Sequence, residues 1–544
     1  MAGFFERLDE VAGVQGGMAV VWLERVAFVF LVLTFAAAPH SIAATQTAWI
    51  AGTLAWVVRL FLTPRVRFRL GWLDAALWGL FAWSVISSLV SYQPLVSVDK
   101  LRGAAIFLIF YFVFYNVRTR KAAALLAFVM IGSCMVNVLW MPIERAIGRG
   151  VEIKELNPES PLAKALLQEG DTLLEVDRQK VSTPEEVVAA IERTDTSRVK
   201  FYRPDFEYAV VVQRSDLLPG TDGLQRLGIS GWKKSHNWRS KGFYGHYTTY
   251  AEVLQLIGSL ALGLFVAAMG RNGKRTGDSH GTDKRWPLSS IVANFKSPGV
   301  VALAVAVIGI AFALLLTVTR APQLAFVISA AVIILFGLGR KWFLAAMLVL
   351  LPVAGAGLLF LQQSRNVEFI DRQDESTRYR QMMWRDGVKL WTENPRHFVF
   401  GVGMDSIKEH WREWDMFEGG KQPLGHFHST PLQLAVERGL PALVLWLLTV
   451  GLFARSLIYG HGRAGKRQAA TAPGSDIWSR GILLGGAGGL LGFFVSGLVH
   501  YNLGDQEVAM VFFIIMGLGL AVGKMSDEEN AERPSSAAAV RLAA

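Results

Sequence analysis

The chain has 544 residues, of which 52% are hydrophobic, and its mean hydropathy is +0.34. These values exclude an ordinary soluble enzyme, because the apolar residues are gathered into runs of bilayer length. The formal charge of +11 could suggest nucleic acid, but the basic residues crowd alternate short loops. Such a distribution reports membrane topology and contact with anionic lipid, so no nucleic-acid partner is expected.

About twelve apolar runs have the length of a membrane span, roughly 17–25 residues. The first carries Glu24 and Arg25 and lacks a small-residue cleavage site, so we interpret it as a retained span. The expected spans are near 20–38, 46–63, 72–91, 101–116, 122–141, 250–269, 298–317, 323–338, 342–361, 440–458, 480–499 and 506–524. The predicted fold class is therefore mainly α, a polytopic helical membrane protein of about twelve transmembrane helices.

The loop charges predict the orientation of these spans. The basic loops lie near 65–69, 118–121, 271–285, 340–341 and 463–467. The intervening loops 39–45 and 501–505 have almost no Lys or Arg. The positive-inside rule then places both termini in the cytoplasm, and segments 142–249 and 362–430 outside it. The tail 526–544 is rich in Ala, Ser and charge and is predicted to be disordered.

The first external segment contains a small α+β module at about 146–215. Residue alternation predicts strands over 150–156, 170–176, 198–202 and 208–213, and Thr183 is a suitable cap for a helix ending at Ile191. The run from Ser160 to Val187 resembles a bacterial PDZ domain. That resemblance implies binding of a periplasmic peptide or protein by strand addition, and a spacer is the alternative. The one candidate for a peptide-carboxylate loop is 146–150.

The basic stretch after this module, 233–252, combines cationic side chains, glycines and aromatics and runs directly into a span. It contains Arg239 and His246. A basic cluster beside a membrane more often contacts solvent or lipid than a substrate. Arg320 lies between two long apolar runs, against the positive-inside bias, and the hydroxyls of Thr317 and Thr319 suggest a polar pocket beside it.

The second external segment begins with four arginines, at 372, 378, 380 and 385, among apolar residues at helical spacing. This pattern predicts an amphipathic helix that lies in the membrane interface and presents Arg to anionic groups. His426 and His428 close the segment at the mouth of the next span. Ionisable groups at such a boundary are rare unless they face a cavity, a partner or a substrate.

Arginines and histidines from four loops therefore converge on one side of the membrane. Arg offers a planar fork of donors suited to phosphate, and His can accept a proton near neutral pH. No P-loop, zinc spacing or HExxH motif is present, so neither a metal nor another cofactor is expected. These residues favour chemistry on a lipid diphosphate, which carries its own leaving-group energy.

The most specific motif is His428-Ser429, nine residues, then Gly439. It resembles the motif of the bacterial O-antigen ligases, within a wider superfamily of lipid-linked glycan transferases. The family pattern continues to Gly, Thr or Tyr where this chain has Ala442. The Asn-Pro and Gly-Val-Gly of 394–403, and Thr-Arg-Ala at 319–321, also look like family positions.

The resemblance implies a metal-independent, inverting transferase of the bacterial inner membrane with a periplasmic active site. The donor would be a glycan on undecaprenyl diphosphate, and the acceptor a hydroxyl of the lipid A–core. His428 would be the general base, and Arg320 and Arg239 would bind the diphosphate. The further substrate-binding candidates are Arg378, Arg380, His426, His246 and Ser429.

The expected domains follow this division. They are an N-terminal transmembrane region (1–145), the insert (146–215), a central transmembrane region (216–361), a periplasmic loop (362–439), a C-terminal transmembrane region (440–525) and the tail (526–544). Two enzymatic alternatives remain open, a polymerase of the same donor and a protein O-oligosaccharyltransferase. A non-enzymatic transporter or scaffold is less favoured, because paired intramembrane carboxylates and inverted halves are missing.

Overall fold

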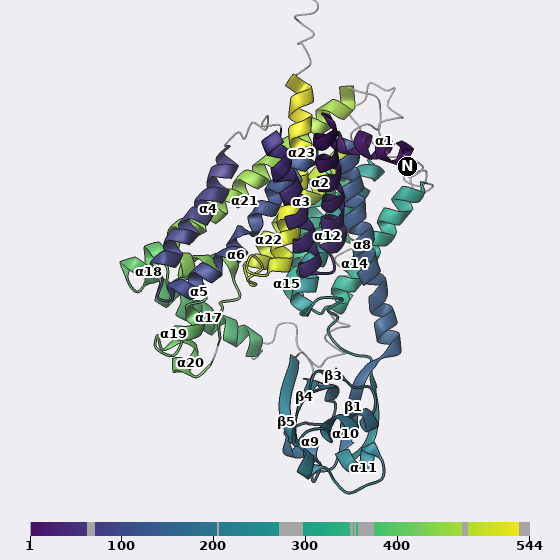
Figure 1. Cartoon of the computed structure of the whole chain (residues 1–544), viewed down its shortest axis with the longest axis vertical. Helices are drawn as coiled ribbons and strands as arrows, with labels where there is room; N and C mark the ends of the chain where they lie inside the picture. Colours follow the sequence, from purple (N-terminus) through teal and green to yellow (C-terminus); the bar gives the residue numbers. More distant parts are fainter. Residues whose placement is uncertain are drawn as a thin grey trace, which may run out of the picture. The chain divides into compact units, whose positions relative to one another are not determined.

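The computed structural model describes residues 2–62, 71–203, 206–270, 297–348, 352, 355–356, 375–422, 424–470 and 477–531. The chain divides into two compact units. The helical unit comprises Met1–Asn137 and Phe243–Ala544, and the sheet unit comprises Val138–Gly242 (Figure 1). The basic loop 271–285, and a portion of the expected span 342–361, lie outside the described residues.

Nine helices of the described residues are long and apolar enough to cross a membrane. They are α2 (Met18–Ala37), α4 (Trp72–Leu89), α8 (Arg120–Ile147), α12 (Tyr247–Met269), α14 (Pro298–Leu316), α15 (Arg320–Leu338), α21 (Thr430–Ala470), α22 (Ile477–Gly497) and α23 (Gln506–Ala531). The mainly helical, polytopic membrane fold is thereby confirmed, while the count of twelve stays a prediction.

Two further expected spans are helical but differ from a simple apolar helix. The helix α3 (Ile42–Leu62) has the length of a span, but Gln46 and Arg59 lower its hydropathy. The run 101–116 forms α6 (Leu101–Ala104), a 3-10 turn η1 (Ala105–Phe107) and α7 (Leu108–Asn116). The helix α23 continues to Ala531, past the expected start of a disordered tail at 526.

The centre of the helical unit is the pair α12 and α22. Nearly every residue of α12 is buried, and α22 faces it with glycines. A Cβ on Gly485 would lie 2.7 Å from the Cα of Leu260, so a larger residue would push the two helices apart. Small residues are a common way for membrane helices to bring their backbones together. The rings of Phe493 and Phe512 stack at 4.2 Å and join α22 to α23.

The loop before α21 folds into short helices at one end of the helical unit, together with α5 (Pro94–Asp99) (Figure 1). These helices are α17 (Glu375–Thr392), α18 (Pro395–Phe400), α19 (Ile407–His410) and α20 (Met416–Gly420). They enclose a core of their own, which we call the loop core. Its buried members are Met383, Leu390, Val402, Ile407, Trp411, Met416, Phe417, Phe427 and Val436.

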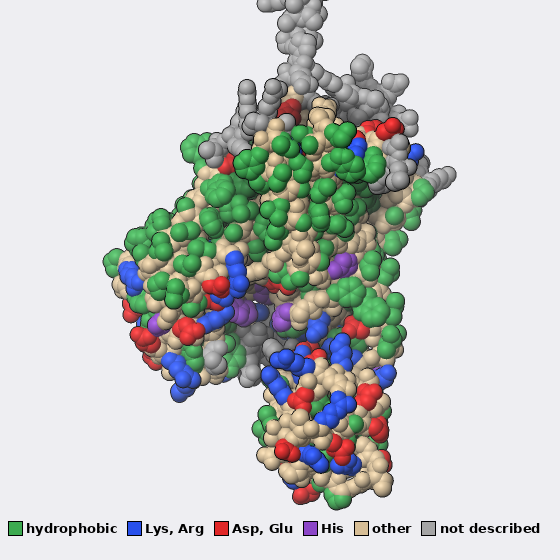
Figure 2. Space-filling model, viewed as in Figure 1, with side chains coloured by type: hydrophobic (Ala, Val, Ile, Leu, Met, Phe, Trp, Pro, Cys, Tyr) green, Lys and Arg blue, Asp and Glu red, His purple; other side chains and the backbone are tan. Residues whose placement is uncertain are grey.

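The loop core accounts for part of the apolar face of α17, which was predicted to lie in the membrane interface and to present Arg to anionic groups. Met383 and Leu390 are buried in the loop core with Phe417 and Phe427, whereas Val388 is 47% exposed. The interfacial position of α17 stays a prediction. Figure 2 shows hydrophobic side chains over the long helices of this unit, as expected for surfaces that face lipid.

Ion pairs between helices stabilise the opposite end of the helical unit. Glu24 is buried, and its carboxylate pairs with Arg59 at 2.7 Å and with Arg118 at 2.8 Å. Asp9 of the helix α1 (Ala2–Ala12) pairs with Arg25 at 2.7 Å. These ion pairs tie α1, α2, α3 and the segment before α8 together.

The sheet unit is antiparallel in the order β5-β4-β2-β1-β6, with β3 paired to β2. Its strands are β1 (Arg149–Leu156), β2 (Thr172–Val176), β3 (Gln179–Lys180), β4 (Thr196–Arg203), β5 (Phe206–Gln213) and β6 (Ile229–Ser235). The helices are α9 (Pro161–Lys164), α10 (Pro184–Ile191) and α11 (Gly223–Leu227). The sheet extends past the expected end at 215, because β6 pairs with β1. Its resemblance to a PDZ domain stays a prediction.

Candidate functional site

The loop that carries the two histidines is anchored by the residue between them. Phe427 is fully buried in the loop core, and its N–H donates to Oε1 of Gln433 at 2.8 Å. Its carbonyl accepts from Nε1 of Trp384 at 2.9 Å. The rings of His426 and His428 lie on the same side of this anchor, with centroids 4.2 Å apart. His428 has a positive φ of 46°, a conformation that L-residues other than glycine seldom adopt.

Basic side chains surround His428. Burial, and after it the charges of His426, His500, Arg380 and His246 in that order, lower the pKa of His428 to about 3. Three of those neighbours are predicted site residues, from α17, the entry to α12 and the loop itself. His428 is therefore a neutral ring at physiological pH, in a place where a positive charge is unstable.

The spacing between His428 and Gly439 has a structural basis. The helix α21 begins at Thr430 and is interrupted at Gly439, where φ is 77°. A Cβ at that position would lie 1.9 Å from the carbonyl oxygen of Val399. The interruption lets the N–H groups of Val402 and Gly403 donate to the carbonyls of Val436 and Glu437 at 2.9 and 2.8 Å. The motif thus spans one short helix, with the loop core docked at its far end.

The other family-like positions support the same docking. The side chain of Asn394 caps α18 by accepting from the N–H of His397 at 2.9 Å. Ser429 is buried, and its hydroxyl accepts from the N–H of Leu432 at 3.5 Å, as a helix cap does. Ala442 is fully buried inside the membrane helices. The expected role of Ser429 in substrate binding stays a prediction.

Arg320 is the first residue of α15 and is exposed. The turn before it is tight, with Val318 at a positive φ of 52°. The hydroxyls of Thr317 and Thr319 donate to the carbonyls of Leu314 and Thr317 at 2.7 and 3.2 Å. They therefore satisfy backbone carbonyls at the end of α14, and the polar pocket expected beside Arg320 stays a prediction.

The remaining predicted residues are distributed between the two units. In α17, Arg378 is exposed, with its guanidinium over the Tyr379 ring at 5.7 Å, and Arg380 is half-buried. His246 caps α12 by accepting from the N–H of Thr248 at 3.2 Å. Arg239 belongs to the sheet unit, whereas His428 lies in the helical unit, so its role in the site stays a prediction.

The basic stretch that contains Arg239 is less open than its composition suggests. Trp238 is buried between the guanidinium groups of Arg145 and Arg149, at 5.7 and 4.5 Å from the ring centroid. Lys233 lies on β6 and pairs with Glu152 of β1 at 3.1 Å. Some of the basic residues in and around this stretch therefore stabilise the sheet unit through contacts within it.

The structure adds three residues that sequence reasoning did not select. Glu252 is buried in α12, and its Oε1 lies 3.0 Å from Nδ1 of His500. Nδ2 of Asn502 lies 3.4 Å from the other carboxylate oxygen. A single acidic residue inside a predicted span was the available signal for this cluster. Its partners come from a short loop more than 240 positions away, and no pattern connects them.

Asp505 lies beside this cluster in the loop between α22 and α23. Its carboxylate accepts a hydrogen bond from the hydroxyl of Thr249. Burial raises the pKa of Asp505 to about 7, against the effect of that bond. A neighbouring carboxylate, Glu507, adds to this rise.

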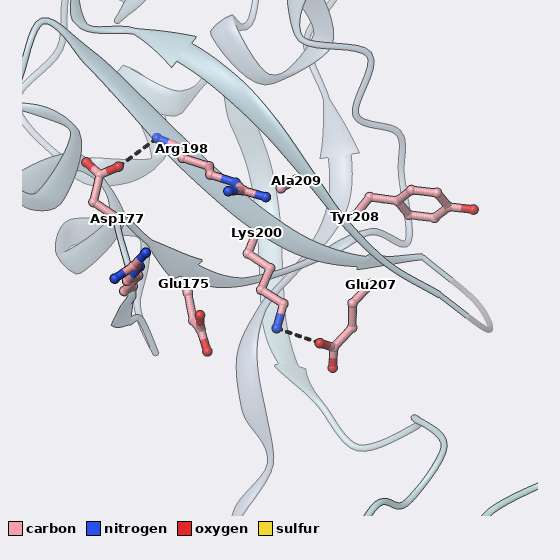
Figure 3. Close-up of a pocket in the computed structure, with 8 residues that line it drawn as sticks. Glu175, Asp177, Arg198, Lys200, Glu207, Tyr208 and Ala209 are labelled. Atoms are coloured by element: carbon pink, nitrogen blue, oxygen red, sulfur yellow. Dashed lines mark hydrogen bonds and ion pairs between the residues drawn. The ribbon is translucent and has the colours of Figure 1, made fainter. Parts of the chain in front are cut away.

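The sheet unit has an open hollow of about 440 Å³ over β2, β4 and β5 (Figure 3). Within it Lys200 pairs with Glu207 at 2.6 Å, and Asp177 accepts from the backbone N–H of Arg198 at 2.8 Å. The expected carboxylate loop 146–150 runs into β1, which is paired on both sides. A Cβ on Gly150 would lie 2.2 Å from the carbonyl oxygen of Leu173, so no larger residue fits at this position. Peptide binding by the 146–150 segment stays a prediction.

Comparison with protein families matches residues 304–447 to the family described as O-antigen ligase. The matched segment includes Arg320, Arg378, Arg380, His426 and His428, together with Gly439. It excludes the sheet unit and the two separate segments that carry Glu252 and His500. No curated protein matches the chain.

Proposed function

We propose that this protein, whose residues 304–447 match the O-antigen ligase family, moves a glycan from undecaprenyl diphosphate to a sugar hydroxyl of the lipid A–core. The reaction would take place at the periplasmic face of a bacterial inner membrane. The observation that carries the proposal is the gathering of His246, His426, His428, His500 and Arg380 at the family motif.

The charge of the proposed donor suits this cluster. A site of histidines and arginines in which His428 is held neutral is a receptor for an anion, and a diphosphate would neutralise the surrounding charge. Binding of the donor would raise the pKa of His428 from about 3 toward the range in which a general base works well. The base would therefore become active only when the donor is in place.

The arginines would serve the leaving group. Arg380 is close enough to lower the pKa of His428, and Arg320 lies at the N-terminus of α15, where the helix dipole also favours an anion. Preorganised donors of this kind contribute about 3–4 kcal/mol each to transition-state stabilisation. Arg378 would bind a more distant group of the donor.

The proposed reaction is a single displacement. His428 takes the proton of the acceptor hydroxyl, and that oxygen attacks the anomeric carbon as its bond to the diphosphate oxygen breaks. The diphosphate leaves with the electron pair, and attack from the opposite face inverts the anomeric centre.

The test is the His428→Ala variant expressed in cells that lack the wild-type protein. We expect the lipopolysaccharide ladder to disappear and undecaprenyl-linked glycan to accumulate, with the variant still present in the membrane. Activity should fall by about a hundred-fold or more, because a general base is lost. A full ladder in cells with the variant would refute the assignment of His428.

Metal independence is a separate prediction, motivated by the missing metal-ligand motifs of the sequence. Transfer by the purified protein should continue in the presence of a strong chelator. Loss of transfer that a divalent ion then restores would contradict it.

The same assay distinguishes two related functions. If the protein were a polymerase, its loss would leave lipopolysaccharide capped by a single repeat unit. Transfer to Ser or Thr of a protein would leave the ladder unchanged. The sheet unit favours that second candidate, because β5 and β6 each have an edge with no paired strand among the described residues, and an extended peptide could join either edge.

A further inference from the structure

A buried carboxylate with polar partners lies beside the proposed site and has no role in the mechanism above. Glu252 is 1% exposed, inside a helix of the membrane-spanning bundle. A carboxylate in such a place is costly unless donors surround it. The hydroxyl of Ser496, Nδ1 of His500 and Nδ2 of Asn502 all reach it, so the cluster is built to hold a negative charge.

The pair formed with His500 fixes the state of that imidazole. Because Nδ1 of His500 faces the carboxylate of Glu252 at 3.0 Å, the proton of a neutral ring lies on Nδ1, and Nε2 is left as the acceptor. A carboxylate in this position also stabilises the ring when both nitrogens are protonated.

His500 is also tied to the loop that carries His428. Its carbonyl accepts from both the N–H and the hydroxyl of Thr430, each at 3.1 Å. That hydroxyl lies 2.9 Å from Oδ1 of Asn502. Two residues before Thr430 stands His428, whose pKa is lowered by the charge of His500. The two rings are therefore neighbours held by one hydrogen-bond network.

We propose that His500, oriented by Glu252, is a second proton-handling residue of the transfer reaction and holds the acceptor's proton after His428 has removed it. The inference rests on the proposed function, since it needs a hydroxyl to be deprotonated. It assigns to Glu252 a positioning role that acts through His500.

The environments of His428 and His500 differ, and this difference explains why one would remove the proton and the other would hold it. The groups named around His428, which are His426, His500, Arg380 and His246, are all cations when charged, so a proton on His428 is poorly held. His500 faces His428 and His426 from the loop, but Glu252 from α12 gives it a negative partner.

The proton and bond changes then balance. The acceptor O–H bond breaks as the new C–O bond forms at the anomeric carbon, and the old C–O bond to the diphosphate breaks. The proton passes through His428 to Nε2 of His500, and Glu252 remains ionised. Release of the proton to water resets the pair for the next donor.

The experiment uses the purified full-length protein in detergent, with undecaprenyl diphosphate-linked glycan as donor and lipid A–core as acceptor. Glu252→Gln keeps the size of the side chain and removes its charge. We expect the transfer rate to fall about a hundred-fold. The KM for the donor should stay within about three-fold, because donor binding is not involved. The acid side of the pH–rate profile should move to lower pH, because the protonated ring loses its carboxylate.

Gln255→Met is the matched control. Gln255 is a buried polar residue one turn from Glu252 on the same helix, and it donates to the hydroxyls of Ser259 and Ser329, each at 3.2 Å. Its rate and pH profile should equal those of the wild type.

Each outcome is informative. Wild-type protein that transfers nothing refutes the proposed function, and the inference falls with it. An active wild type with an equally active Glu252→Gln variant overturns the inference alone. A slow variant with an unmoved pH profile shows a merely structural role and also overturns it. If Glu252→Gln does not fold, His500→Gln is measured instead, with the same fall in rate expected. Full activity in that variant contradicts the proposal.

Discussion

At the scale of single residues, His428 has an unfavourable backbone conformation and an environment that is unfavourable for its charged form. Its φ of 46° is a strained value for a residue with a Cβ, and such strain costs on the order of 1–3 kcal/mol. Burial and neighbouring charge lower its pKa to about 3. Both penalties are typical of a residue kept for chemistry and not for stability.

The lowered pKa of His428 predicts how stability depends on pH. Between about pH 6.5 and pH 3 the unfolded chain binds a proton at this position and the folded chain does not, so stability falls as the pH decreases through that window. We expect His428→Asn to remove this contribution to acid destabilisation, since Asn does not titrate and tolerates a positive φ. Thermal unfolding at pH 7.5 and pH 5 measures it, and an equal fall in Tm for both proteins would contradict it.

Asp505 predicts the opposite dependence. Its pKa is raised to about 7 by burial, so the folded chain binds a proton that the unfolded chain loses above about pH 4, and stability is lost as the pH rises through 7. Asp505→Asn should therefore raise the Tm more at pH 8 than at pH 5. A gain that is the same at both values would show that its ionisation does not matter.

At the scale of elements, the interruption of α21 decides where the motif ends and where the loop core docks. Gly439→Ala would place a Cβ 1.9 Å from the carbonyl oxygen of Val399, in a conformation with φ of 77°. We expect a loss of several kcal/mol in the free energy of unfolding, together with a loss of transfer.

The control for this variant lies on the same helix. A Cβ at Gly451 would meet nothing within 4 Å, so Gly451→Ala should be neutral or stabilise α21 by up to about 1 kcal/mol. Chemical unfolding of both variants in detergent gives the comparison. Equal stabilities of the two variants would show that the structure accommodates a Cβ at position 439 without loss of free energy of unfolding.

At the scale of the whole molecule, the sheet unit has an apolar core of its own. Sixteen buried residues, among them Val151, Leu173 and Ile191, form this core within the sheet unit. We expect residues 148–242, expressed alone, to fold and to unfold cooperatively on heating. Circular dichroism during a thermal melt provides the measurement. A gradual loss of signal without a transition would show that the unit depends on the rest of the chain.

Much of this organisation was readable from the sequence. Length and periodicity are local properties, so the apolar runs predicted most of the membrane helices, and alternation predicted the strands β1, β2, β4 and β5. The spacing from His428 to Gly439 lies within residues 304–447, the segment that matches the O-antigen ligase family. The strand β6 was missed because charged residues obscure its alternation.

The sequence by itself determined the membrane class, the family motif and the histidines at the mouth of a span, because each depends on residues close together in the chain. Only the tertiary structure decided that α17 packs on the loop core, that Thr317 and Thr319 satisfy backbone carbonyls, and that Glu252 meets His500. Those contacts depend on how whole helices pack against one another. The packing depends in turn on how closely two helix backbones can approach, as the glycines of α22 allow α12 to do. No local sequence pattern encodes such an approach.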